Sequence, residues 1–379
     1  MRLVVTGGGT GGHVYPAIAV AEYIKESDPA STVTFVGSAG GPEADAARAA
    51  GIPFEGLTVA GLIGKSPLKA IKALLMFARS TLRCRRLFKK LEPDRVLGTG
   101  GYAAATACLT ALWSRVPLLL LEMNYEPGWV TRMFARCART VAVAHQGTAA
   151  RLSPRANVVV TGVPVRAEIE ALAGEEARRA AADEAIETFG LEKGRRTLLV
   201  FGGSQGAQAI NEALWAALPA LAGRADLQVL HMTGKNNFDV PERSGAEAAA
   251  AAGRLLYAAL PYSERMDLAF AVADLAISRA GAGTVAELTA AMLPSVLVPY
   301  PHATGGHQEK NARALAETGA VVVIPQTGGS ASDAVSFAIG LMDDRGELAA
   351  MKEAARSARG AGGTKGIARL LEELTLDGR

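Results

Sequence analysis

The stretch MRLVVT-GGGTGG-HVYP, residues 1–16, decides the fold. Its apolar part, Met1–Thr6, predicts a buried strand, and an Ala/Ile-rich helix is expected over Ala17 to about Glu26. Five of the six residues in Gly7–Gly12 are glycine, so the backbone can turn tightly and approach a ligand with no Cβ in the way. A strand, a glycine loop and a helix in this order predict an anion site made of backbone N–H groups.

Short apolar strands and helical stretches alternate through the rest of the chain. Near-continuous Val/Leu/Ile runs of this kind predict parallel sheets with helices on both faces. The expected strands are Thr32–Gly37, Phe54–Ala60, Arg95–Gly100, Pro117–Met123, Thr140–Ala144, Asn157–Gly162, Thr197–Gly202, Leu227–Thr233, Leu255–Leu260, Leu275–Ser278, Ser295–Pro299 and Ala320–Pro325. Between the two series, the polar stretch Arg166 to Arg196 has no strand signal. After it, Gly202–Ala207 and a helix over Gln208–Leu218 repeat the opening pattern.

We therefore expect an α/β protein of two Rossmann-like domains whose parallel sheets face a central cleft. The first domain is predicted over residues 1–165 and the second over residues 166–363. A glycine-rich hinge precedes a last helix, at about 364–379, which either completes the second domain or packs back on the first.

The composition is that of a globular protein of 379 residues, 49% hydrophobic and 20% charged. An odd number of cysteines without close spacing, Cys84, Cys108 and Cys137, argues against a disulfide framework or a zinc site and fits a reducing cytosol. We expect no secretory signal, because the chain starts with a core strand, and no transmembrane helix, because no apolar run is long enough.

Positive charge is concentrated in the first half of the chain. Residues 1–166 carry 20 lysines and arginines against 10 aspartates and glutamates, although the net charge of the whole chain is only +3. Within Leu62–Leu91 there are basic and apolar residues but no acidic one. Such a stretch is typical of segments that lie on an anionic bilayer surface. A solvated helix face that packs Leu74–Phe77 into the core is the alternative, and sparse aromatic residues argue against nucleic acid.

The opening loop fits G-x-G-x-x-G, but the second strand ends Phe35–Ser38 without the carboxylate that a dinucleotide site uses for its ribose. No Gly-Lys-Ser/Thr follows, which excludes a P-loop. Thr10 and His13 are the polar additions to the loop, and His13, at the glycine-lined helix start, is a candidate general base. A merely tight turn is the alternative for the glycines.

Two further strand ends in the first half carry candidate residues. The loop Gly98-Thr99-Gly100-Gly101-Tyr102 exposes backbone where open α/β sheets bind ligands. Glu122 and Asn124 lie at the end of the next strand and either face the same cleft or hold the turn by hydrogen bonds.

In the second half, the stretch Ser278–Glu287 ends a strand in Ser-Arg, continues through small residues and enters a helix. Such a loop and helix start can hold a diphosphate, and Glu287 is placed to accept two ribose hydroxyls; Thr284 as a plain N-cap is the alternative. Polar clusters follow at Pro299–His302 and His307–Ala312. Asp-x-Asp does not occur, and no His/Cys cluster has metal spacing, so we expect no metal and no cofactor.

Taken together, these motifs resemble the MurG family over almost the whole chain. The resemblance rests on Gly8–Pro16, Gly98–Tyr102, Thr161–Arg166, Gly202–Ala207, Ser278–Glu287 and His307–Ala312, which occur in this order at family-like spacing. It implies a GT-B fold and an inverting transfer of GlcNAc from UDP-GlcNAc to the 4-hydroxyl of the muramic sugar of lipid I, which forms lipid II for peptidoglycan. The enzyme would act as a peripheral protein at the cytoplasmic face of the cell membrane and bind that membrane through about residues 62–91.

The resemblance also implies roles for individual residues. The second domain would hold UDP through the ribose and diphosphate contacts of Glu287 and its loop, while Ser204 would touch phosphate, Ser263 would lie near uracil and Gln308 would contact the sugar. Substrate-binding candidates by this match are Thr10, Gly11, Gly12, Asn124, Arg166, Ser204, Ser263, Ala282, Gly283, Thr284, Val285, Ala286, Glu287 and Gln308. Acceptor-side candidates are Gly100, Gly101, Tyr102 and Glu122, and the candidate catalytic base is His13.

The chain departs from the family at one strand end. The family commonly reads His-Glu-Gln-Asn where this chain has Leu121-Glu122-Met123-Asn124, and Thr131 stands where asparagine is usual. Three other interpretations remain open. They are another GT-B lipid glycosyltransferase, a UDP-GlcNAc 2-epimerase on the same fold, and a non-catalytic nucleotide-binding membrane adaptor.

Overall fold

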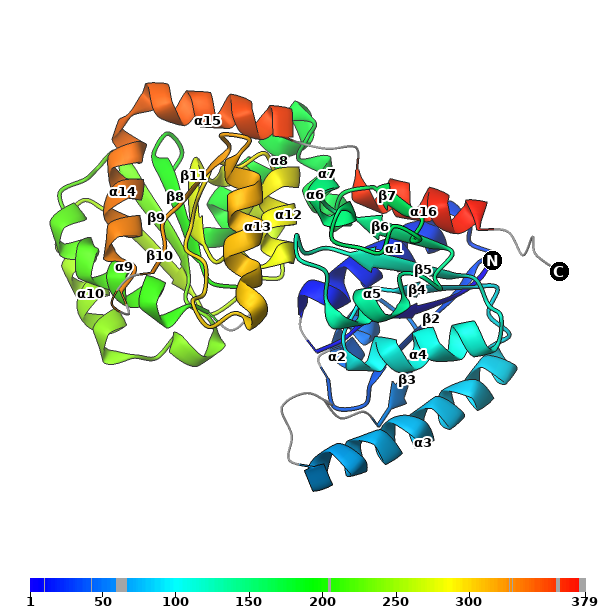
Figure 1. Ribbon diagram of the computed structural model, residues 1–379. Helices are drawn as coiled ribbons and strands as arrows, with labels where there is room; N and C mark the ends of the chain where they lie inside the picture. The colour runs from blue at the N-terminus through cyan, green and yellow to red at the C-terminus, as the bar shows by residue number, and fades with distance from the viewer. Residues whose placement is uncertain are drawn as a thin grey trace. The chain divides into compact units, whose positions relative to one another are not determined.

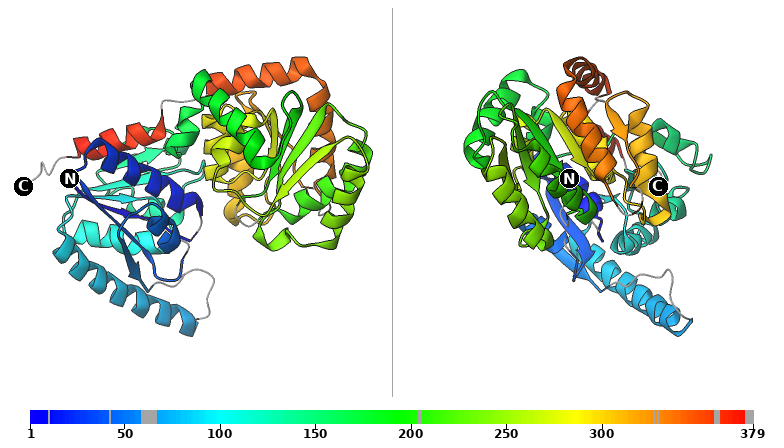
Figure 2. Two further views of the ribbon diagram at one scale, coloured as in Figure 1. Left: turned by 180° about the vertical axis from the view of Figure 1, so that it is seen from behind. Right: turned by 90° about the vertical axis from the view of Figure 1, so that its left-hand side faces the viewer.

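The computed structural model describes residues 1–9, 11–41, 43–58, 67–203, 206–326, 328, 330–358 and 362–374, and in the basic stretch it describes side chains from Leu75 onward. The contacts divide the chain into two compact units, Met1–Arg166 with Ala361–Arg379, and Ala167–Gly360. Each unit is built on one parallel sheet with helices on both faces (Figures 1 and 2). The predicted α/β class with two Rossmann-like folds is confirmed.

The first unit contains a seven-stranded sheet in the order β3-β2-β1-β4-β5-β6-β7. Its strands are β1 (Arg2–Thr6), β2 (Thr32–Ser38), β3 (Phe54–Leu57), β4 (Arg95–Gly98), β5 (Leu118–Glu122), β6 (Thr140–Val143) and β7 (Val158–Val160). Its helices are α1 (Gly11–Ser27), α2 (Glu43–Ala49), α3 (Pro67–Leu91), α4 (Tyr102–Trp113), α5 (Trp129–Phe134), α6 (Gln146–Ala149) and α16 (Gly363–Glu373).

The second unit contains a six-stranded sheet in the order β10-β9-β8-β11-β12-β13. Its strands are β8 (Arg196–Phe201), β9 (Leu227–Met232), β10 (Leu256–Leu260), β11 (Leu275–Ser278), β12 (Ser295–Leu297) and β13 (Val321–Val323). Its α-helices are α7 (Ala167–Ala171), α8 (Glu175–Phe189), α9 (Gln208–Leu221), α10 (Pro241–Ala251), α11 (Met266–Val272), α12 (Ala282–Ala290), α13 (His307–Ala316), α14 (Ser332–Asp343) and α15 (Arg345–Ala358). Two short 3-10 turns are η1 (Lys235–Asn237) and η2 (Thr304–Gly306).

Strand side chains alternate between two faces, and each face is covered by helices. In the first unit, Val4, Val36 and Val96 share one buried cluster with Cys84 and Phe88 of α3, and residues of α4 and α5 complete it. In the second unit, α9, α10 and α14 cover one face of the sheet while α8, α11, α12 and α13 cover the other (Figure 1).

The last helix, α16, belongs to the first unit, where it packs against α1. Thr364 donates its hydroxyl to the carbonyl of Val165 at 3.1 Å, and Arg95 Nε donates to the carbonyl of Leu374 at 2.8 Å. A Cβ on Gly363 would lie 2.4 Å from the backbone of Val163, so only glycine permits this close approach.

Helix α1 begins earlier than the sequence predicts, at Gly11 instead of Ala17. Proline is best tolerated in the first turn of a helix. Pro16 is instead the sixth helical residue and is buried. Its missing N–H removes one bond near the helix start, where several N–H groups have no intrahelical partner in any case. The glycines of the opening motif therefore form the helix N-terminus themselves.

Across the described part of the chain, every helix is too short or too polar to span a bilayer.

Candidate active site

The order of the strands reverses at one point in each sheet. In the first sheet this point lies between β1 and β4, and in the second it lies between β8 and β11. Open α/β sheets bind ligands at the carboxyl ends of the strands beside such a switch point. The glycine-rich and small-residue loops of the sequence occupy these positions: the loops after β1 and β4 in the first unit, and the loops after β8 and β11 in the second.

In the first unit, the loops after β1 and β4 lie in close contact. Gly101 has φ +87° and ψ 164°, a conformation that essentially only glycine adopts. A Cβ at Gly101 would lie 2.3 Å from the carbonyl oxygen of Gly8, and one at Gly7 would lie 2.1 Å from Oγ1 of Thr99. These glycines are therefore required for the two loops to meet, and not only for a turn within either loop.

His13 is half-buried in the first turn of α1 and is fixed against the loop after β4. Its Nδ1 lies 2.6 Å from the carbonyl oxygen of Thr99, and Oγ1 of Thr99 donates to the carbonyl of His13, also at 2.6 Å. Because a carbonyl can only accept, Nδ1 must carry the proton of this hydrogen bond. In the neutral ring the lone pair is then on Nε2, which is the arrangement a general base requires. A Cβ at Gly100 would lie 2.8 Å from the ring, so glycine there leaves space for the imidazole.

Glu122 is the last residue of β5, the neighbour of β4 in the sheet, and Asn124 lies in the turn after it. The Glu122 carboxylate is 3% exposed and organises the turn after β5. Its Oε1 accepts hydrogen bonds from the backbone and side-chain amides of Asn124, at 3.0 and 3.2 Å. Its Oε2 accepts from the N–H of Gly128 at 2.8 Å and from the hydroxyl of Thr131 at 2.7 Å. Glu122 therefore orients Asn124 from within the turn.

The three departures from the family pattern lie around this carboxylate. Leu121 and Met123 are each 1% exposed, so apolar side chains fill the interior at these positions. Thr131 supplies a donor to Glu122 although it is shorter than asparagine. The chain thus keeps the buried carboxylate satisfied in spite of the substitutions.

We predict that Thr131→Val destabilises the first unit by about 1.5–3 kcal/mol, because it removes a hydrogen bond to a buried charged group without changing the shape of the side chain much. Thr110→Val is the matched control. Thr110 is equally buried, and its hydroxyl donates at 2.8 Å to the carbonyl of Thr106, a neutral partner in the same helix. The control should cost only about 0.5–1.5 kcal/mol. Urea unfolding of both variants measures the difference, and equal losses would contradict the prediction.

In the second unit, α12 begins directly after the β11 loop and contains the candidate residues Ala282–Glu287. Gln308 is the second residue of α13, which packs against α12. Its Oε1 accepts the N–H of Ala280 at 3.2 Å and that of Tyr300 at 2.9 Å, so the amide oxygen joins the loops after β11 and β12. This fixes the orientation of the amide, so that Oε1 is the acceptor in these two bonds and Nε2 is the donor of the group.

Arg279 lies in the loop after β11 and also contacts the loop after β12. It is 8% exposed, and its guanidinium donates to the carbonyl of Val298 at 3.1 Å and to Oε1 of Gln326 at 2.9 Å. Desolvation lowers the pKa of Arg279 from its ordinary value. The guanidinium of arginine nevertheless stays protonated in proteins. The loops that would contact a ligand are thus held together by one buried cation and one amide.

The remaining predicted residues lie at other positions along the two units. Ser263 follows β10 and accepts the N–H of Arg265 at 3.1 Å. β10 is three strands from β11, so the carboxyl ends of these two strands are roughly 14 Å apart across the sheet. Arg166 is the last residue of the first unit before α7. Thr10 and Ser204 lie outside the described residues.

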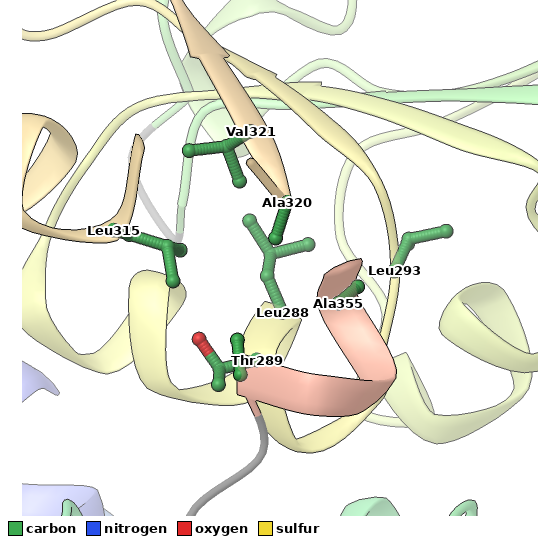
Figure 3. Close-up of a pocket in the computed structure, with 8 residues that line it drawn as sticks. Leu288, Thr289, Leu293, Leu315, Ala320, Val321 and Ala355 are labelled. Carbon is green, nitrogen blue, oxygen red and sulfur yellow. The ribbon is translucent and has the colours of Figure 1, made fainter. Parts of the chain in front are cut away.

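An apolar hollow in the second unit does not belong to this arrangement (Figure 3). Its lining residues are Leu288, Thr289, Leu293, Leu315, Ala320, Val321, Ala355 and Ala358. The single hydroxyl among them, on Thr289, donates to the carbonyl of Val285 at 2.7 Å. The hollow lies at the amino end of β13, whereas the small-residue loops follow carboxyl ends of strands. In the described part of the chain, no group of three or more His, Cys, Asp or Glu residues is placed to hold a metal ion.

Sequence reasoning did not assign a role to Thr99, whose carbonyl fixes the tautomer of His13. A usable signal was present, because Thr99 is the one side chain with a hydroxyl in the loop Gly98–Gly101 after a strand. It also did not identify Thr131 as a partner of Glu122.

Comparison with known proteins agrees with this architecture. Residues 3–143 match the glycosyltransferase family 28 N-terminal domain, and residues 197–365 match the glycosyltransferase family 28 C-terminal domain. The chain is 39% identical over 374 residues, 98% of each chain, to a UDP-N-acetylglucosamine--N-acetylmuramyl-(pentapeptide) pyrophosphoryl-undecaprenol N-acetylglucosamine transferase of Moorella thermoacetica. A protein of the same name from Nitratidesulfovibrio vulgaris is 39% identical over 356 residues, 94% of this chain and 93% of its own.

Solved structures show the same fold. The crystal structure of Acinetobacter baumannii MurG superposes with a TM-score of 0.75 at 27% identity and covers 98% of this chain and 99% of that one. A putative UDP-N-acetylglucosamine 2-epimerase of Listeria monocytogenes has a TM-score of 0.66 at 15% identity, with 98% and 96% covered, and so shares the fold alone. With both halves matched and relatives 39% identical over nearly the full length, the chain belongs to the MurG family within glycosyltransferase family 28.

Proposed function

We propose that this protein transfers GlcNAc from UDP-GlcNAc to the 4-hydroxyl of the muramic sugar of lipid I, with inversion at the anomeric carbon, and so forms lipid II. The observation that carries the proposal is the 39% identity over 98% of the chain to a relative named for this transfer. The hydrogen bond that leaves Nε2 of His13 as a base agrees with it.

Inversion requires one in-line displacement. The acceptor oxygen forms a bond to the anomeric carbon as the bond from that carbon to the diphosphate oxygen of UDP breaks. Nε2 of His13 takes the proton of the acceptor hydroxyl, and the bond from Nδ1 to Thr99 stabilises the imidazolium that results. UDP leaves as an anion, and N–H groups at a helix start can stabilise its negative charge.

In this proposal the second unit binds the donor. The N–H groups at the start of α12, in Ala282–Val285, hold the diphosphate, and Glu287 accepts the ribose hydroxyls. Gln308 donates its Nε2 group to the sugar, Ser204 touches phosphate, and the backbone of Ser263 lies at the uracil. Arg166 lies on the nucleotide side.

The first unit binds the acceptor in this proposal. Gly11 and Gly12 at the start of α1, together with Gly100 and Gly101, provide backbone N–H groups for the lipid-linked diphosphate and sugar, and Thr10 contacts the sugar. Asn124, held by Glu122, faces the acceptor.

The test is incubation of the protein with radiolabelled UDP-GlcNAc and lipid I. We expect label to appear in lipid II. Free ManNAc would indicate a 2-epimerase instead, and intact UDP binding without turnover would indicate a nucleotide-binding adaptor. Either result would contradict the proposed transfer.

We further propose that α3 binds the anionic cytoplasmic surface of the cell membrane as the chain's peripheral attachment. Residues 62–66 of the basic stretch lie outside the described part, and side chains are described from Leu75. Leu75 is 62% exposed and Leu82 is 50% exposed on α3, and Trp113 at the end of neighbouring α4 is 52% exposed. Exposed basic residues lie among them, namely Arg79, Arg83, Arg86, Lys89 and Lys90. The guanidinium of Arg85 lies 4.4 Å from the Trp113 ring centroid.

We predict that the triple variant Leu75→Ser, Leu82→Ser, Trp113→Ser binds phosphatidylglycerol vesicles with an affinity at least about tenfold lower than the wild type. The variant loses the apolar side chains that insert into the bilayer but keeps the basic charge. Sedimentation with vesicles measures this, and raised salt should weaken the wild-type binding. Phe337→Ser is the control, since Phe337 is 39% exposed on α14 of the other unit. Unchanged binding of the triple variant would exclude this surface.

A further inference from the structure

A chain of hydrogen bonds runs through the interior of the second unit and ends at its glycine loop. Nε1 of Trp215 in α9 donates to the hydroxyl oxygen of Tyr257 in β10 at 3.0 Å. The same oxygen lies 2.8 Å from Nδ1 of His231 in β9, and Nε2 of His231 lies 3.0 Å from Oδ1 of Asn211 in α9. Nδ2 of Asn211 donates to the carbonyl of Thr233 at 2.8 Å.

The direction of every bond in this chain is determined. The carbonyl of Thr233 can only accept, so the amide of Asn211 must turn its Nδ2 toward Thr233 and its Oδ1 toward His231. His231 must then carry its proton on Nε2, and its Nδ1 accepts the hydroxyl proton of Tyr257. The indole of Trp215 can only donate, so the Tyr257 oxygen accepts its N–H. The hydroxyl proton of Tyr257 is therefore available to Nδ1 of His231. His231, Asn211 and Thr233 are each 1% exposed or less.

The carbonyl of Thr233, at the end of β9, is the contact point with the glycine loop after β8. A Cβ on Gly206 would lie 2.2 Å from this oxygen, and Gly206 has φ +76°, so only glycine permits the contact. Nδ2 of Asn237 also donates to the same oxygen, at 3.3 Å. The N–H of Gly206 donates to the carbonyl of Gly203 at 2.9 Å and closes the loop. The position of Gly206 thus depends on where the Thr233 carbonyl is held.

We propose that Asn211 and His231 are positioning residues for Gly206 in the glycine loop after β8, and that they set the affinity of the second unit for a nucleoside diphosphate by holding the Thr233 carbonyl against Gly206. The inference rests on the proposed function, because it takes this loop as part of the donor phosphate site. His231 fixes the amide of Asn211, and Asn211 fixes the carbonyl.

Gln228 provides a matched control on β9, the strand that contains His231. It is 1% exposed, like Asn211, and forms three hydrogen bonds, from the N–H of Glu192 at 2.9 Å, to Oγ1 of Thr197 at 2.9 Å and to the carbonyl of Glu192 at 3.2 Å. It lies at the amino end of β9, whereas His231 lies near the carboxyl end next to the glycine loop. Loss of either network removes buried hydrogen bonds, but only one network reaches the loop.

The experiment measures UDP binding by titration calorimetry for the wild-type full-length chain and for the variants Asn211→Ala, His231→Leu, His231→Gln and Gln228→Leu, with a thermal unfolding curve for each. We expect Asn211→Ala and His231→Leu to raise the Kd for UDP by about tenfold or more, equivalent to about 1.4 kcal/mol. His231→Gln keeps a donor toward Asn211 and an acceptor toward Tyr257, so its Kd should stay within about threefold of wild type. Gln228→Leu should lower the melting temperature and leave the Kd unchanged.

Wild-type affinity in folded Asn211→Ala would overturn the inference, as would an equal rise of Kd in Gln228→Leu, which would show general destabilisation. Asn211→Ala keeps the proposal testable if His231→Leu does not fold, because alanine is well tolerated in a helix. Absence of UDP binding by the wild-type chain is a separate result. It would contradict the donor site itself and, with it, this role for Asn211.

Discussion

Replacing His13 with alanine is expected to lower kcat for lipid II formation by roughly 10²–10⁴-fold, the usual contribution of a general base. The Kd for UDP should not change, because the proposed donor residues are in the other unit. The expectation follows from the bond of 2.6 Å between Nδ1 of His13 and the carbonyl of Thr99, which leaves Nε2 as the basic nitrogen. Single-turnover assays with saturating UDP-GlcNAc measure the chemical step directly.

His13→Asn separates catalysis from loop positioning. The side-chain amide of asparagine places an N–H group close to where Nδ1 of histidine lies, so the hydrogen bond to Thr99 can form, but no basic nitrogen replaces Nε2. If His13 is the base, the asparagine variant should be as inactive as the alanine variant. If His13 only joins the loops after β1 and β4, asparagine should restore most of the activity, and the assignment of His13 as the base would be wrong.

The sequence predicted the order and type of the strands because their apolar runs are short, nearly continuous and bounded by glycine. It also predicted that glycine-rich or small-residue loops follow β1, β4, β8 and β11, as they do in the structure. Both features are local and can be read within about ten residues. The start of α1 was missed because a proline within a helix gives the same local signal as a proline that begins one.

The contacts that give each residue its role could not be predicted in the same way. His13 and Thr99 are 86 residues apart, and their hydrogen bond exists only because β1 and β4 are neighbours in the sheet. Glu122 was open to two interpretations, and the four donors around its carboxylate become visible only when the turn to Thr131 is folded. Likewise, Leu121 and Met123 look like lost polar groups in the sequence, whereas both side chains are part of the interior.

We expect the stability of the second unit to depend on pH, because His231 is buried in its interior. Burial lowers the pKa of His231 from 6.5 to about 3, with a smaller effect of the nearby Arg243 cation from α10. Tyr257 is the ionisable group that faces the ring from β10, and its pKa is raised above its usual value by burial, so it stays neutral. Arg243 is paired with Glu247 at 2.7 Å, which leaves little net charge on that side.

The sign of the effect follows from proton binding. Below pH 6.5 the unfolded chain takes up a proton at His231 that the folded chain does not, so the free energy of unfolding falls as the pH falls. The loss approaches about 1.4 kcal/mol per pH unit and ends near pH 3, where the folded chain also binds the proton. Between pH 6.5 and pH 4.5 the contribution of this one histidine is therefore about 2 kcal/mol, because the slope starts at half its limiting value at pH 6.5.

His231→Gln isolates this contribution, because glutamine can keep both hydrogen bonds but does not titrate. The difference in unfolding free energy between wild type and variant should change by about 2 kcal/mol from pH 6.5 to pH 4.5, in favour of the variant at acid pH. Urea unfolding followed by tryptophan fluorescence measures this difference. Both proteins carry Trp113→Phe and Trp129→Phe, so that Trp215, which lies in the second unit, is the only tryptophan. Parallel pH curves for the two proteins would mean that the folded chain accepts the proton at ordinary pH. In that case the hydrogen-bonded chain from Trp215 to Thr233 would not hold His231 in its neutral form.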